Sequence, residues 1–191
     1  LMGTSTYDTI TISNYGYLDI ASTSNVTHTT LSWDNQGIIA DNGGYFPLFS
    51  SGGDLNIPLA SKLIANTARL YTNITINGTL THSVNVNTEL YKIDLTSSGD
   101  ITLSENGIID LDGKGYAGGY GPGPGIDTGS YSSGAGHGGR GGASLDTESV
   151  GGVTYDATTS PTQLGSGGGD DGGVTGGPSG GGAIKLTANG T

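Results

Sequence analysis

The sequence predicts an all-β fold, a right-handed parallel β-helix, or β-solenoid, that carries a long glycine-rich loop insertion. Three observations predict it: short apolar runs with a period of two, turn phrases that recur along the chain, and an abrupt rise in glycine content after residue 113. Hydrophobic residues make up 32% and charged residues 12% of the 191 residues, and Gly, Thr, Ser and Asn supply most of the rest. This composition favours strands and turns over helices.

The strand prediction comes from the first 111 residues. Apolar and β-branched residues alternate there with polar ones, and Gly, Asn, Asp and Ser separate the runs, a pattern typical of strands. The runs are residues 7–12, 17–20, 26–33, 55–57, 70–76, 84–86, 91–95 and 101–103. Residues 60–69 form the one candidate helix, and they lack good caps.

Recurring phrases indicate a solenoid. GIIADNG at residues 37–43 is similar to GIIDLDG at 107–113, and GDLNI at 53–57 is similar to GDITL at 99–103. Stacked coils repeat their turns and strands in this way. The spacing of the phrases is irregular, so a β-sandwich or jelly roll is the alternative.

We expect one domain over residues 1–191, with residues 113–182 as a glycine-rich insertion within it. This segment holds 27 of the 38 glycines, without the strict Gly-X-Y period of collagen. The tyrosines and the histidine within it are residues that a passive linker does not need. Strand alternation returns at residues 182–187, so both ends of the insertion adjoin strands.

Charge and composition exclude several classes of protein. The formal net charge is -11, from 17 acidic and 6 basic residues, so nucleic acid is not an expected partner. Cysteine is absent, which excludes disulfides and thiolate metal sites. No apolar run has the length of a membrane span. Sequons begin at Asn25, Asn73, Asn77 and Asn189 and permit N-glycosylation in an extracellular or cell-surface protein.

Several phrases in the second half of the chain resemble a known module. They are GKGY at 113–116, GPGPG at 121–125, GAGHGGRGG at 134–142, GGVTYD at 151–156, GSGGG at 165–169 and GGGAIKL at 180–186. Together they resemble a glycine-rich module of large secreted or cell-surface parallel β-helix proteins. The resemblance implies a loop layer folded against the side of a β-helix, whose last strand leads into further coils. It brings no catalytic residues.

Acidic residues form the candidate metal site. DLDGKG at 110–115 is similar to the start of a calcium loop, in which alternate carboxylates and a glycine turn surround a cation. The twelfth position is Gly121 in place of glutamate, which excludes an EF-hand. The candidate is a calcium site outside the EF-hand pattern, with Asp110, Asp112, Asp170 and Asp171 as ligands; Asp-Gly turn chemistry is the alternative explanation. We expect no other cofactor.

Two groups of side chains within the insertion are candidate functional residues. His137 and Arg140 lie among glycines, where they either bind an anion or bond loop carbonyls; we prefer the second, a loop-locking role. Tyr116, Tyr120 and Tyr131 are candidates for stacking on glycans, and covering the flank of the β-helix is the alternative.

These observations favour a non-enzymatic extracellular structural protein, a subunit or segment of a self-assembling surface filament, sheath or adhesin stalk. Its partners would be copies of itself, joined head to tail by strand pairing, or further β-helix coils. A glycan-binding adhesin module is the first alternative. A carbohydrate-active β-helix enzyme is the second; it would need clustered acids, and nothing in the sequence assigns Asp110, Asp112 or Arg69 to that role.

Overall fold

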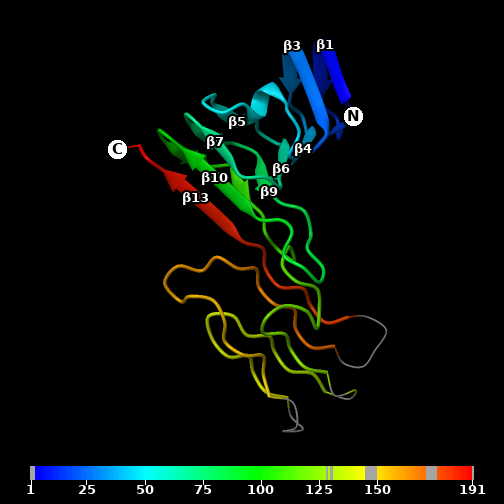
Figure 1. The fold of residues 1–191 in the computed structure, drawn as a ribbon, viewed down its shortest axis with the longest axis vertical. Coiled ribbons are helices and arrows are strands. Elements are labelled where there is room, and N and C mark those ends of the chain that lie inside the picture. The colour runs from blue at the N-terminus through cyan, green and yellow to red at the C-terminus, as the bar shows by residue number, and fades with distance from the viewer. Residues whose placement is uncertain (1–2, 128, 130, 145–149, 171–175, 191) are drawn as a thin grey trace. The chain divides into compact units, whose positions relative to one another are not determined.

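The computed structural model describes residues 3–127, 129, 131–144, 150–170 and 176–190 (Figure 1). The described chain is all-β: it contains strands, one short 3-10 turn and no α-helix. The elements are β1 (Gly3–Ile12), β2 (Tyr17–Ala21), β3 (Ser24–Trp33), β4 (Ile38–Asn42), η1 (Pro47–Phe49), β5 (Leu55–Ile57), β6 (Lys62–Ala65), β7 (Arg69–Tyr71), β8 (Ile74–Ile76), β9 (Thr79–Thr81), β10 (Ile93–Ser97), β11 (Ile101–Leu103), β12 (Ile108–Ile109) and β13 (Ile184–Ala188). The described chain has no helix long and apolar enough to span a membrane.

The strands form four sheets, in the orders β1-β3, β13-β10-β7, β11-β8-β5 and β12-β9-β6-β4-β2. Every strand pair with a defined register is parallel. Sandwiches are built from antiparallel sheets, so the parallel pairing disfavours that alternative. In Figure 1, β7, β10 and β13 lie side by side in one of these sheets.

The chain visits the three larger sheets in a repeating order. After β6 it runs through β7, β8 and β9, and then through β10, β11 and β12, so each pass adds one strand to each sheet. The predicted strand at 70–76 is split into β7 and β8, because the chain passes from one sheet to the next at Thr72 and Asn73.

The core follows from the period of two along each strand. In β5 and β8 the first and third residues are buried and the central residue is not. The two strands pair so that Leu55 lies opposite Ile74 and Ile57 opposite Ile76. Stacked strands thus bring like residues together, and side chains on the buried face form continuous apolar columns.

Polar side chains also stack from strand to strand. The Asn42 amide donates to Asp19 at 2.7 Å, and the Asn66 amide donates to Asn42 at 2.6 Å. A second row runs from Asn77 to Asn56 at 2.9 Å. Such ladders satisfy amide groups between parallel strands and fix the register.

The chain divides into two compact units. The first comprises residues 1–83, 93–110 and 185–191, and the second comprises residues 84–92 and 111–184. The second unit contains the predicted insertion together with residues 84–92, where the sequence predicts strand at 84–86 and from 91 onward. That prediction is wrong for residues 84–86, because the Asn85 side chain binds backbone groups of Leu90, Tyr91 and Lys114 there in place of a strand partner.

In the described part of the second unit, backbone segments pack against one another without regular strand pairing. The segment 165–169 exchanges hydrogen bonds with residues 116–120, with Gly125, with Ser133 and with residues 178–181. A strand in a sheet has at most two neighbours, so this segment is surrounded by backbone. A Cβ atom at Gly167 would overlap the Ala117 carbonyl, which explains why such a segment needs glycine.

Candidate functional site

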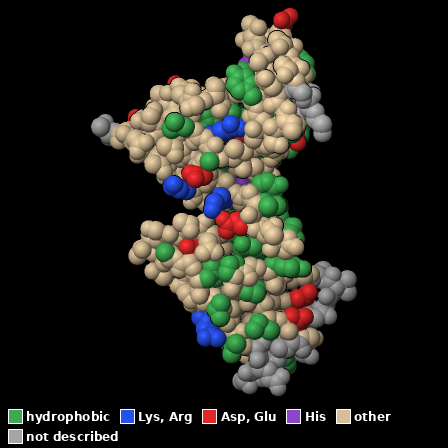
Figure 2. All heavy atoms as spheres, viewed as in Figure 1, with side chains coloured by type: hydrophobic (Ala, Val, Ile, Leu, Met, Phe, Trp, Pro, Cys, Tyr) green, Lys and Arg blue, Asp and Glu red, His purple; other side chains and the backbone are tan. Residues whose placement is uncertain are grey.

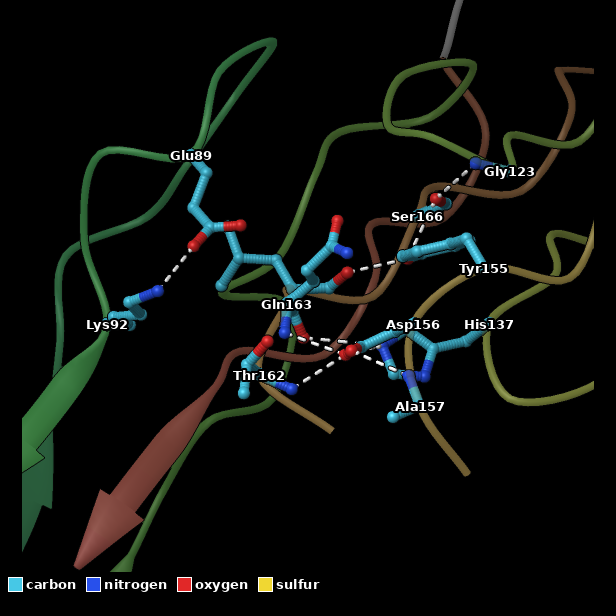
Figure 3. A network of polar contacts seen from close by, with 11 residues as sticks. Glu89, Lys92, Gly123, His137, Tyr155, Asp156, Ala157, Thr162, Gln163 and Ser166 are labelled. Carbon is cyan, nitrogen blue, oxygen red and sulfur yellow. Dashed lines mark hydrogen bonds and ion pairs between the residues drawn. The ribbon is translucent and has the colours of Figure 1, made fainter. Parts of the chain in front are cut away.

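The carboxylate of Asp156 is the centre of a polar network in the second unit. It accepts hydrogen bonds from the backbone N–H groups of Ala157 at 2.8 Å, Thr162 at 2.7 Å and Gln163 at 2.8 Å (Figure 3). Asp156 has a φ of 61°, a conformation that Asp tolerates better than most residues. The backbone donors, first that of Gln163, lower the pKa of Asp156, so the carboxylate is ionised at neutral pH.

His137 lies between this carboxylate and Tyr155. Its Nε2 is 3.3 Å from the Gln163 carbonyl oxygen and 3.6 Å from Asp156 Oδ2, and its ring packs edge-on against Tyr155 with centroids 4.7 Å apart. Both neighbours of Nε2 are acceptors, which favours the tautomer with the proton on Nε2. In the neutral ring Nδ1 is then an acceptor, and no hydrogen bond to Nδ1 is found among the described residues.

Tyr155 extends the network to a third segment. Its hydroxyl donates to the Leu164 carbonyl at 2.6 Å and accepts from Ser166 Oγ at 2.9 Å, while Ser166 Oγ accepts from the Gly123 N–H at 3.0 Å. Burial raises the pKa of Tyr155. Within the described residues Ser166 contacts Tyr155 and not His137, so the network does not provide the base-activated serine of nucleophilic catalysis.

A surface cavity of about 330 Å³ opens beside this network. It is lined by His137, Pro161, Gln163, Ala183 and Ile184 and by three glycines, at 165, 181 and 182. The cavity therefore combines an imidazole and an amide with apolar side chains and with backbone that carries little side-chain cover.

The three candidate glycan-binding tyrosines differ in exposure. Tyr116 is only 8% exposed, so its ring is packed inside the second unit and not presented to a surface ligand. Tyr120 and Tyr131 are 49% and 48% exposed. Figure 2 shows hydrophobic side chains distributed over the visible face of this unit, with few charged groups among them. Glycan contact thus stays a prediction for Tyr120 and Tyr131.

The candidate calcium residues do not form one cluster in the described structure. Asp110 follows β12, and its N–H donates to the Leu80 carbonyl at 3.0 Å. Asp112 lies in the next turn, and one carboxylate oxygen of Asp170 is buried without a partner among the described residues. Asp171 lies outside the described residues. The described ranges contain no group of three or more His, Cys, Asp or Glu side chains suited to a metal ion, and calcium binding stays a prediction.

The other predicted residues have distinct environments. His137 bonds a loop carbonyl in the manner of a loop-locking residue, whereas Arg140 is exposed and has no hydrogen-bond partner in the described ranges. Asn25 and Asn189 are exposed, and Thr191 of the last sequon is not described.

The sequons at Asn73 and Asn77 lie between strands. Both amides donate to residues of the preceding strand segment, and both side-chain oxygens accept from the following one. A glycan there would compete with these hydrogen bonds, so Asn25 is the better acceptor for N-glycosylation.

Comparisons of the chain with family models, with curated proteins and with solved structures found no match.

Sequence reasoning missed Asp156, Tyr155 and Ser166. The available signal was the pairing of an acid with a tyrosine at 155–156 next to a Ser-Pro turn at 160–161, since Asp often binds nearby backbone N–H groups in such loops. The contacts of Asp156 and Tyr155 with His137, and of Tyr155 with Ser166, could not be predicted, because they join separate segments of the insertion.

Proposed function

We propose that this chain is an extracellular structural protein, a β-solenoid unit of a surface filament, sheath or adhesin stalk that assembles end to end by strand pairing. It is non-enzymatic in this proposal. The repeated visits to three parallel sheets and the asparagine ladders support a solenoid of stacked coils, because stacked coils produce both features. The extracellular assignment depends on the sequons and on the resemblance to surface β-helix modules.

One observation carries the assembly proposal: the apolar column at the β11 end of its sheet is uncovered. Ile57 and Ile76 are both 0% exposed and are in register with Leu103 of β11, which is 53% exposed. Among the described strands, the column is thus covered where another strand follows and exposed at β11. Burying it under one more strand is favourable by about 25 cal/mol per Å² of apolar area removed from water.

The backbone of β11 is also open at this edge. The Ile74 N–H donates to the Asp100 carbonyl at 3.0 Å, and the Ser104 N–H donates to the Ile76 carbonyl at 3.0 Å, so the even-numbered residues face β8. Because polar groups alternate along a parallel strand, those of Ile101 and Leu103 face away from β8. They form a template for an additional parallel strand.

Assembly can be tested by negative-stain imaging and light scattering over a range of protein concentrations. The variant Leu103→Lys places a charge in the open column, and we expect it to abolish the assemblies that the unaltered chain forms. Thr75→Lys is the matched control: it adds the same charge on the outward face of β8, which is paired on both sides, and we expect it to assemble.

A monomer at every concentration, with and without the Leu103→Lys substitution, would overturn the assembly proposal. Adding calcium to parallel samples separates the metal prediction from this one. Assemblies that form only with calcium would support the carboxylates as ligands. Assemblies that form equally without calcium would show that end-to-end assembly does not require the ion.

A further inference from the structure

We propose that the cavity beside His137 is a binding site for one uncharged sugar residue, with a sugar hydroxyl donating its hydrogen bond to Nδ1 of His137. The proposal is separate from end-to-end assembly, since the cavity residues belong to the second unit and the strand edge at β11 to the first. It also differs from the tyrosine surface predicted from the sequence.

Neighbouring groups hold the imidazole of His137, and with it the acceptor Nδ1, in one orientation. The Gln163 carbonyl and the ionised Asp156 carboxylate both lie on the Nε2 side, and Tyr155 packs on the ring, so the imidazole is fixed in orientation and tautomer. Asp156 is in turn fixed by three backbone N–H groups. A side chain held by such a second layer of contacts is preorganised for its ligand.

The chemistry of the walls selects the class of ligand. None of the described residues that line the cavity is Lys, Arg, Asp or Glu, so the walls offer no charged partner to an ionic ligand. The side chains of Pro161 and Ile184 offer apolar surface, while His137 and the Gln163 amide offer hydrogen bonds. A pyranose has an apolar C–H face and several hydroxyl groups, and it matches this combination.

The volume and the glycine backbone fit the same ligand. About 330 Å³ is at the lower end of the range for small-molecule pockets, enough for one sugar residue and too small for an extended oligosaccharide. Gly165, Gly181 and Gly182 line the cavity without side chains of their own. Backbone amide and carbonyl groups can therefore approach the hydroxyls of the ligand.

A substitution at one of the lining glycines can be used to block the cavity. A Cβ atom at Gly181 meets no atom within 4 Å, so the fold accepts a larger residue there, and Gly181→Leu would occupy space at the cavity. Gly142 is likewise open and lies outside the cavity, which makes Gly142→Leu the matched control. His137→Phe keeps an aromatic ring against Tyr155 and removes the acceptor.

The test is saturation-transfer NMR on the full chain with glucose, galactose, mannose and N-acetylglucosamine as separate probes. We expect at least one sugar to receive transfer. We expect Gly181→Leu and His137→Phe to weaken its affinity at least tenfold, and Gly142→Leu to leave it within twofold. Circular dichroism of each variant checks that the second unit is folded.

Absence of transfer to all four sugars would overturn the proposal. Transfer that survives Gly181→Leu, or that is lost with Tyr120→Ala and not with His137→Phe, would place the binding elsewhere and equally overturn it. None of these substitutions touches β11, so loss of assembly in the imaging experiment and loss of sugar binding are distinguishable outcomes.

Discussion

The guanidinium of Arg69 binds the carboxylate of Asp41 through two hydrogen bonds, from Nε to Oδ2 at 2.7 Å and from Nη2 to Oδ1 at 2.6 Å. The Asp41 side chain is 2% exposed and that of Arg69 is 19% exposed. Arg69 also donates to the Gly44 carbonyl at 3.0 Å and lies 5.3 Å from the centre of the Phe49 ring. This buried pair links β4 to β7 inside the first unit.

Removing one partner of the pair is expected to destabilise the first unit strongly. Arg69→Met leaves a buried carboxylate without its cation, and we expect a loss of about 3–5 kcal/mol in the free energy of unfolding, measured by urea denaturation. Arg69→Met combined with Asp41→Asn should cost much less than the sum of the two single changes. As a control, Glu89→Gln disrupts a more exposed pair with Lys92 and should cost less than about 1 kcal/mol.

Because of Tyr71, we expect the free energy of unfolding to decrease in alkaline solution. Burial, and next the nearby Asp41 carboxylate, raise the pKa of Tyr71 well above its ordinary value of 10.0. Above about pH 10 the unfolded chain therefore loses a proton that the folded chain retains, and the free energy of unfolding falls by up to about 1.4 kcal/mol per pH unit. Urea midpoints at pH 9, 10 and 11 measure this slope. Tyr71→Phe should make it shallower, and an unchanged slope would contradict the prediction.

Because of His28, we expect the protein to become less stable in acidic solution. Both ring nitrogens are buried without a partner among the described residues, and the ring lies 5.0 Å from that of Phe46. Burial lowers the pKa of His28 below its ordinary value of 6.5. As the pH falls below about 6.5 the unfolded chain binds a proton that the folded chain does not, so stability decreases. Melting temperatures between pH 7.5 and 5.5 should fall less for His28→Leu than for the unaltered chain.

Gly167 tests the backbone packing of the second unit. A Cβ atom there would overlap the Ala117 carbonyl, so Gly167→Ala forces two backbone segments apart, and we expect a cost of about 1–3 kcal/mol or more. Gly142→Ala, where the added carbon has open space, should be close to neutral. Proteolysis rates of the two variants compare the effects. Equal rates would mean that residues 165–169 are not packed as described.

The sequence-based predictions were most accurate where local pattern decides structure. Alternation in the runs ending at Ile57 and Leu103 predicted β5 and β11, because a strand with one buried face has a period of two. The same alternation at Val84 and Val86 predicted a strand that does not exist. There the side chain of Asn85 accepts a hydrogen bond from the Tyr91 N–H and donates one to the Lys114 carbonyl. Lys114 is distant in the sequence, so local pattern does not reveal this contact.

The sequence alone determined that the chain is β-rich, acidic and without cysteine, and that glycine concentrates in one segment. These properties depend on residue type and on spacing within a few positions. Only the tertiary structure decided that Arg69 meets Asp41, that Asp156 holds His137, and that Leu103 lies in an open column. Each of these depends on which strand or loop stacks on which, and the free energy of that choice comes from contacts between residues about twenty or more positions apart.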